Sequence, residues 1–147
     1  MSPDAIKVIL QTLFNFCKEN KFKHEHMIIA EELLTDTIEE LTIHNIKLIV
    51  YKHFNMTEQQ VDVPSRKGEL VKARQIAMAI AYTLSDEYKM HWSLNDIAYE
   101  IGKRDHATVL HAKKTVRNQR DTNRKYDEMY RTIEERIRIR LKPIKEL

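Results

Sequence analysis

Apolar residues recur at three- and four-residue spacing along most of this 147-residue chain, and that spacing is typical of amphipathic helices. Only two Gly and three Pro are present, so the clustered turns that join strands have little support. The pattern therefore predicts an all-α, compact helical bundle. We expect helices at about 3–20, 26–41, 43–54, 69–84, 94–101, 105–117 and 123–141, and one extra turn at 57–61.

The two ends of the chain read as additions to a central unit. Residues 1–42 form a predicted N-terminal helical extension, which would cover the core or pair with a second copy. Its second helix carries acidic residues expected on a solvated face: Glu31, Glu32, Asp36, Glu39 and Glu40. Residues 121–147 form a predicted C-terminal helix, expected to pack on the N-terminal helices; dimerisation or DNA contact is the alternative. Its apolar stripe is Tyr126, Met129, Tyr130, Ile133 and Ile137.

Residues 93–117 combine a short helix, a glycine turn and a second helix with a polar first turn. Ser93 and Asp105 are suited to cap the two helices, and Gly102 follows the last apolar residue of the first. A helix-turn-helix has this layout and presents its second helix to the major groove of DNA. An ordinary pair of packed helices is the alternative interpretation.

The second of these helices divides into two sides. Val109, Ala112 and Val116 form the inward stripe. The outward residues are polar or small: His106, Ala107, Thr108, Lys113, Lys114 and Arg117.

Charge is distributed unevenly behind the net value of +3. Residues 1–63 carry six basic and ten acidic side chains, residues 64–120 eleven and six, and residues 121–147 eight and six. Basic charge therefore gathers around the predicted helix-turn-helix, as a surface that binds a polyanion requires.

Composition and residue spacing exclude several other classes of protein and site. Cys17 is the only cysteine, which excludes an internal disulfide and a cysteine-rich zinc site, and no apolar run is long enough for a membrane helix. The histidines lack the spacing of a helical metal pair, and no nucleophile triad or acid–base pair stands out. We therefore expect a cytoplasmic, nucleoid-associated protein that is not an enzyme and needs no cofactor or metal.

Several motifs resemble the carboxy-terminal, DNA-binding domain of the bacterial chromosomal replication initiator, DnaA. They are Ser65-Arg66-Lys67, then Ala73-Arg74-Gln75-Ile76-Ala77-Met78, and above all Arg104-Asp105-His106-Ala107-Thr108-Val109-Leu110-His111-Ala112. The resemblance covers residues 46–120, roughly half the chain. It implies a Trp-repressor-like helical fold over a central domain at 43–120 and sequence-specific binding of double-stranded DNA.

The resemblance also implies roles for single residues. Arg66 would enter the minor groove, Asp105 and His106 would contact base edges in the major groove, and Thr108 would lie near the backbone. Phosphates would be held by Arg74, Gln75, His111 and Lys114. The full predicted DNA-binding set is Arg66, Lys67, Arg74, Gln75, Lys103, Arg104, Asp105, His106, Ala107, Thr108, His111 and Lys114. For Asp105 a cap alone, for His111 partial burial, and for the loop residues simple solvation are the alternatives.

The chain departs from the family pattern at three places. Ala107 replaces the usual threonine, Tyr82 stands where a basic residue is common, and the connection at 85–92 is longer. We therefore expect the binding mode to transfer and the preferred DNA site to differ.

No glycine-rich loop ending in Gly-Lys-Ser/Thr occurs, since only Gly68 and Gly102 are present. The expectation is thus a free-standing bacterial or phage module without ATP binding, acting in replication control or transcription. The alternative is a protein-interaction adaptor that keeps the initiator fold, with its terminal helices binding a second copy or a replication protein.

Overall fold

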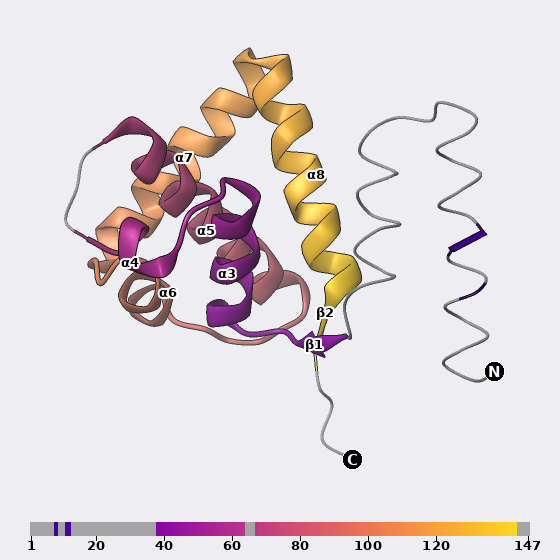
Figure 1. Ribbon diagram of the computed structural model, residues 1–147. Coiled ribbons are helices and arrows are strands. Elements are labelled where there is room, and N and C mark those ends of the chain that lie inside the picture. Colours follow the sequence, from indigo (N-terminus) through magenta and orange to yellow (C-terminus); the bar gives the residue numbers. More distant parts are fainter. Residues whose placement is uncertain (1–7, 9–10, 13–37, 64–66, 144–147) are drawn as a thin grey trace.

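The computed structural model describes residues 8, 11–12, 38–63 and 67–143 (Figure 1). Between residues 38 and 143 the described chain forms six helices and one pair of two-residue strands, which confirms the all-α class. No described helix is both long and apolar enough to cross a membrane. In chain order the elements are β1 (Glu39–Glu40), α3 (Ile43–His53), α4 (Glu58–Val61), α5 (Gly68–Glu87), α6 (Leu94–Glu100), α7 (His106–Thr122), α8 (Arg124–Arg140) and β2 (Leu141–Lys142).

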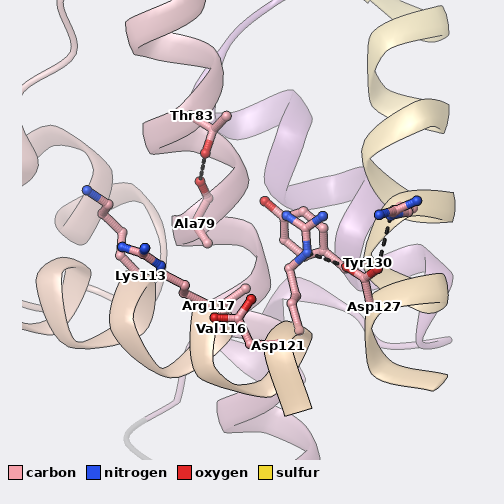
Figure 2. A pocket seen from close by; sticks show the side chains of 10 residues that line it. Ala79, Thr83, Lys113, Val116, Arg117, Asp121, Asp127 and Tyr130 are labelled. Carbon is pink, nitrogen blue, oxygen red and sulfur yellow. Dashed lines mark hydrogen bonds and ion pairs between the residues drawn. The ribbon is translucent and has the colours of Figure 1, made fainter. Parts of the chain in front are cut away.

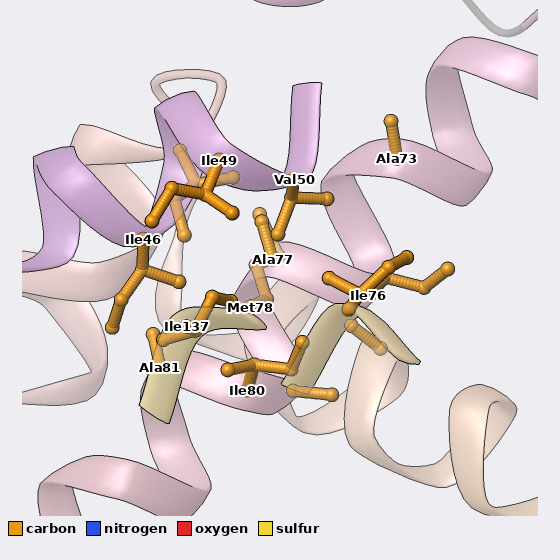
Figure 3. Close-up of a cluster of buried hydrophobic side chains, with 14 of the residues drawn as sticks. Ile46, Ile49, Val50, Ala73, Ile76, Ala77, Met78, Ile80, Ala81 and Ile137 are labelled. Atoms are coloured by element: carbon orange, nitrogen blue, oxygen red, sulfur yellow. The ribbon is translucent and has the colours of Figure 1, made fainter. Parts of the chain in front are cut away.

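Helix α5 is the centre of the core, and its buried alanines let other helices approach closely. Ala73, Ala77 and Ala81 are fully buried, and Figure 3 shows Ala81 beside Ile137 of α8. One continuous apolar cluster includes side chains from α3, α5, α6, α7 and α8. The helices that carry the predicted DNA-binding residues therefore stand on a shared core.

Helix α8 packs on both α7 and α3 (Figure 1). Its predicted stripe is confirmed, because Tyr126, Tyr130, Ile133 and Ile137 are buried in the common cluster. Asn123 separates the two helices and accepts a hydrogen bond from the Tyr126 amide at 3.1 Å. Residues 121–143 thus share the core of the central unit. The expected partner helices at 3–20 and 26–41 lie largely outside the described residues.

The prediction of a helix that continues to residue 41 is wrong at its end. Glu39–Glu40 is a strand that pairs in parallel with Leu141–Lys142, and the Leu41 amide donates to the Lys142 carbonyl at 2.9 Å. Leu141, expected in the last helix, therefore belongs to β2. This pairing joins residues a hundred positions apart, so local periodicity could not indicate it.

Helix α5 runs three residues beyond its predicted end and shortens the connection to α6. Ser85 is still helical, and its Oγ accepts a hydrogen bond from the Trp92 amide at 3.1 Å. Trp92 is half-buried and packs against the core, so it anchors this connection. The connection turns through Lys89 and His91, both with positive φ.

Candidate nucleic-acid interface

The turn between α6 and α7 has the predicted helix-turn-helix geometry. Ser93 and Asp96 form a reciprocal capping box that begins α6. Gly102 has a φ of +86°, and a side chain there would meet Arg74, with its Cβ only 2.8 Å from the Arg74 Cδ. The turn therefore requires glycine for its backbone conformation and for the space that Arg74 occupies.

Asp105 caps α7, as predicted. Its Oδ1 accepts hydrogen bonds from the Thr108 amide at 3.1 Å and the Thr108 hydroxyl at 3.2 Å. These two hydrogen bonds hold the pKa of Asp105 below its usual value. The ionised carboxylate is thus already used in positioning the start of α7. Contact of Asp105 with a base edge stays a prediction.

The outward side of α7 is open. Val109 and Ala112 are fully buried, and Val116 nearly so, which confirms the inward stripe. The opposite side carries exposed residues at three- and four-residue spacing, which places them next to one another on one face. We call this set the α7 outer face: His106, Ala107, Leu110, His111 and Lys114. Leu110 was not predicted to belong to it.

A hollow of about 340 Å³ lies between α5 and α7 beside this face. It gathers five predicted residues that are far apart in sequence. The lining residues are Val71, Arg74, Gln75, Met78, Arg104, Thr108 and His111. Gln75 and Arg104 thus lie close to the start of α7. Lys67 does not line this hollow and immediately precedes the first residue of α5.

Arg74 occupies a buried position and not a surface one. Only 5% of the residue is exposed, and its Nη1 donates to the carbonyls of Val61 at 2.6 Å and Val63 at 3.3 Å. Burial, and then the neighbouring Arg104 cation, lower its pKa. Arg74 therefore connects the residues before the basic loop with the Gly102 turn. This placement favours a positioning role, while direct phosphate contact stays a prediction.

The basic loop itself is only partly described. Arg66 lies outside the described residues. Lys67 is exposed and immediately precedes α5. Asp62, at the other side of the loop, accepts hydrogen bonds from the Tyr51 hydroxyl at 2.9 Å and the Lys47 ammonium at 3.1 Å. The chain leading into the loop is therefore fixed to α3.

Lys47 is a buried charge that the sequence pattern missed. Its ammonium lies among the carboxylates of Glu58, Asp62 and Glu100 and donates to the Glu100 carbonyl at 3.0 Å. Burial opposes its charge, yet contact with Glu58 and Asp62 raises its pKa. Lys47 thus joins α3, α4 and α6 with the start of the basic loop. Its sequence position, next to Ile46, gave no signal of this.

One group of side chains resembles a metal site, but the ammonium group of Lys47 already lies against it. Ligand atoms of His44, Glu58 and Glu100 lie within 4.8 Å of one another. The Lys47 ammonium contacts both carboxylates, so their charge is matched within the protein. Among the described residues we therefore assign no metal.

A second basic region lies in a cleft of about 360 Å³ where α5, α7 and α8 meet (Figure 2). Asp127 pairs with Arg120 at 2.6 Å and with Arg131 at 3.0 Å, and the Arg120 guanidinium stacks 4.1 Å from the Tyr130 ring centre. The two contacts of Arg120 fix α7 against α8, whereas the Asp127–Arg131 pair lies within α8. In the same region Tyr82 receives the Lys113 ammonium over its ring at 3.5 Å.

Comparison with known proteins gives one consistent result. Residues 43–116, half of the chain, match the family described as bacterial dnaA protein helix-turn-helix. The chain is similar to the chromosomal replication initiator protein DnaA of Bacteroides thetaiotaomicron, with 37% identity over 72% of this chain and 22% of the relative. For the Bacteroides fragilis protein the identity is 39% over 74% and 21%. For that of Flavobacterium psychrophilum it is 32% over 90% and 26%.

The chain therefore spans about a fifth to a quarter of the length of these initiators. The similarity covers more of the chain than the half that carries the quoted motifs.

Proposed function

This chain belongs to the bacterial DnaA helix-turn-helix family, and we propose that it binds double-stranded DNA in a sequence-specific manner. The observation that carries the proposal is the α7 outer face. It stays exposed at the beginning of a helix whose opposite side is completely buried. A helix in that position can enter a major groove about 12 Å wide without disturbing the core.

The start of α7 would read the bases. His106 can donate a hydrogen bond or pack on a thymine methyl group, and Asp105 can accept from a cytosine amino group. Lys103 has a φ of 52° and is exposed at the turn, directly before α7. Ala107 lies one position further along the outer face and offers a methyl group only.

Phosphates would be held by the residues around the α5–α7 hollow. Arg104, Gln75 and His111 line it, and Lys114 extends the same face by one turn. Such contacts fix the orientation of a protein on the duplex without reading its sequence. Arg74 would position the chain before the basic loop through its hydrogen bonds to the Val61 and Val63 carbonyls.

The basic loop would reach the minor groove. Arg66 is the residue that the family resemblance assigns to this contact, and Lys67 follows it. Support comes from the fixed chain before the loop, where Asp62 and Val63 are held by hydrogen bonds. An arginine in a narrow minor groove reads groove width, which depends on sequence.

Selection of bound duplexes from a random library tests this proposal, and we expect enrichment of one short motif. On the enriched duplex, Arg66→Ala and His106→Ala should each weaken binding by about 1–3 kcal/mol if the base contacts are good. Glu128→Gln, on the exposed side of α8, is the matched control and should bind normally. Absence of enrichment, or unchanged affinity in both variants, would contradict the proposal.

We infer a role in the control of replication or transcription from the family. The adaptor alternative, with a homodimer or a replication protein as partner, predicts a different outcome of the same selection. It would give no enriched motif, although the folded protein is present.

A further inference from the structure

We propose that Lys113 and Arg117 form a second phosphate contact, on the side of α7 where the cleft with α8 opens. This contact depends on the proposed function and deepens it, because α7 would then be held between the two phosphate backbones that border a major groove. Neither residue belongs to the set of side chains that the family resemblance assigns to DNA.

Lys113 and Arg117 lie on a different side of α7 from the α5–α7 hollow. A helix turns by about 100° per residue, so residues two positions apart point in nearly opposite directions. His111 lines the hollow beside the first three turns of α5, whereas Lys113 lines the cleft beside Ala79 and Thr83. Arg117 is four positions beyond Lys113 and lines the same cleft. We call these two cations the basic edge of α7.

The cations of this cleft differ in their partners. Arg120 and Arg131 both pair with the carboxylate of Asp127, at 2.6 and 3.0 Å. Lys113 instead lies over the ring of Tyr82, with 3.5 Å between its ammonium nitrogen and the ring centre. An aromatic ring attracts a cation but carries no net charge. The ring therefore holds Lys113 in place and leaves its positive charge available to an anion.

Arg117 is exposed, and within the described chain no carboxylate pairs with it or with Lys113. Asp121, the second acidic residue that lines the cleft, lies one turn further along α7. Figure 2 shows Lys113 and Arg117 together at one side of the cleft and Asp127 at the other. Two positive charges without an acidic partner thus lie side by side on the basic edge.

The basic edge adjoins the α7 outer face. Lys113 is three positions beyond Leu110, so the two residues are neighbours on the helix surface. When the outer face enters a major groove, the two phosphate backbones border α7 on opposite sides. The α5–α7 hollow would face one backbone, and the basic edge would face the other. A DNA phosphate is therefore the anion that fits this position, since its oxygens can accept from the ammonium and guanidinium groups.

The first test uses the unaltered protein and replaces single phosphates of the enriched duplex with uncharged methylphosphonates. We expect weaker binding at positions on both strands, where the two backbones border the bound major groove. Lys113→Gln should remove the response at positions on one strand. Arg104→Gln, a change at the hollow, should remove the response at positions on the other strand, as a double-mutant cycle requires.

Salt dependence gives the second test. Lys113→Gln should weaken binding to all duplexes alike and reduce the slope of log K against log salt by about 0.9, and adding Arg117→Gln should bring the reduction to about 1.8. Tyr82→Leu should weaken binding about two- to fivefold, but have little effect once Lys113 is glutamine. Arg131→Gln is the matched control in the same cleft and should keep the full slope, because Asp127 already pairs with this arginine.

The outcomes separate this contact from the proposed function. Selective binding with a full salt slope in both Lys113→Gln and Arg117→Gln would overturn the contact and leave the proposed function standing. Methylphosphonate effects confined to one strand, or an equal loss of slope in Arg131→Gln, would also overturn it. If no duplex is bound selectively, the proposed function fails and this contact with it. The methylphosphonate measurement on the unaltered protein does not depend on how the variants fold.

Discussion

The α7 outer face and the polar scaffold behind it are built in opposite ways. The outer face places His106, Lys114 and their neighbours in solvent. The scaffold, defined here as Lys47 and Arg74 with their hydrogen-bond partners, buries its charges. Lys47 contacts three carboxylates and one carbonyl, and Arg74 donates to two carbonyls.

The two regions therefore have different expected roles: the scaffold positions the backbone, and the α7 outer face contacts the ligand. A buried and partnered cation is held by its own protein contacts, so its main expected effect is on the position of the backbone segments that it joins. An exposed side chain can reach the ligand, but it adds little to stability. Mutations in the two regions should therefore change different quantities.

The largest effect is expected at Lys47. Lys47→Ala leaves the carboxylates of Glu58, Asp62 and Glu100 without their cation, and these groups are partly solvated. We expect a loss of about 2–4 kcal/mol in the free energy of unfolding, toward the lower part of the range for a broken buried pair. Urea unfolding measures it. Lys52→Ala, an exposed lysine of the same helix, should change stability little, and equal losses in both variants would refute the scaffold.

Gly102→Ala should affect both regions. A side chain at φ +86° is strained and meets Arg74, so we expect a loss of about 2 kcal/mol in stability and weaker duplex binding. Gly68→Ala is the control, because its Cβ would meet nothing within 4 Å. Thermal unfolding and a titration with the enriched duplex measure the two effects. A neutral Gly102→Ala would mean that the turn does not require glycine.

Lys114→Gln should change binding alone. Removing one phosphate contact should lower affinity at low salt and reduce the slope of log K against log salt by about 0.9. The unfolding midpoint should stay unchanged, since Lys114 is exposed. Lys125→Gln on α8 is the matched control. A full salt slope in Lys114→Gln would remove this residue from the interface.

The smallest expected effect is on how the stability of the protein depends on pH. His53 ends α3 beside Arg136, and burial, followed by the cations of Arg136 and Lys72, lowers its pKa below 6.5. The unfolded chain then binds a proton more readily than the folded protein as pH falls through 6.5, so stability should decrease on acidification. His53→Gln should show a shallower decrease between pH 7.5 and 5.5. Identical slopes in the two proteins would contradict the assignment.

The parts of the fold that depend on neighbours in sequence were predictable. The caps Ser93 and Asp105, the Gly102 turn and the buried stripe of α7 follow from short-range patterns, and the structure confirms them. The motif around Asp105 and His106 also indicated the family correctly.

The parts that depend on distant residues were not predictable in this way. The β1–β2 pairing joins Glu39 to Leu141, and Lys47 meets Glu100 across 53 positions. Arg74 looked like a surface cation because its acceptors, the Val61 and Val63 carbonyls, are backbone atoms without a sequence signature. Such contacts become visible only when the chain is folded.

Amide chemical shifts, recorded while the enriched duplex is added to the protein, test the central claim most directly. The account predicts large shifts at residues 103–114 and 67–78, around the α7 outer face and the α5–α7 hollow, and small shifts at 124–142. Shifts concentrated in α8 and β1, with residues 103–114 unchanged, would contradict it.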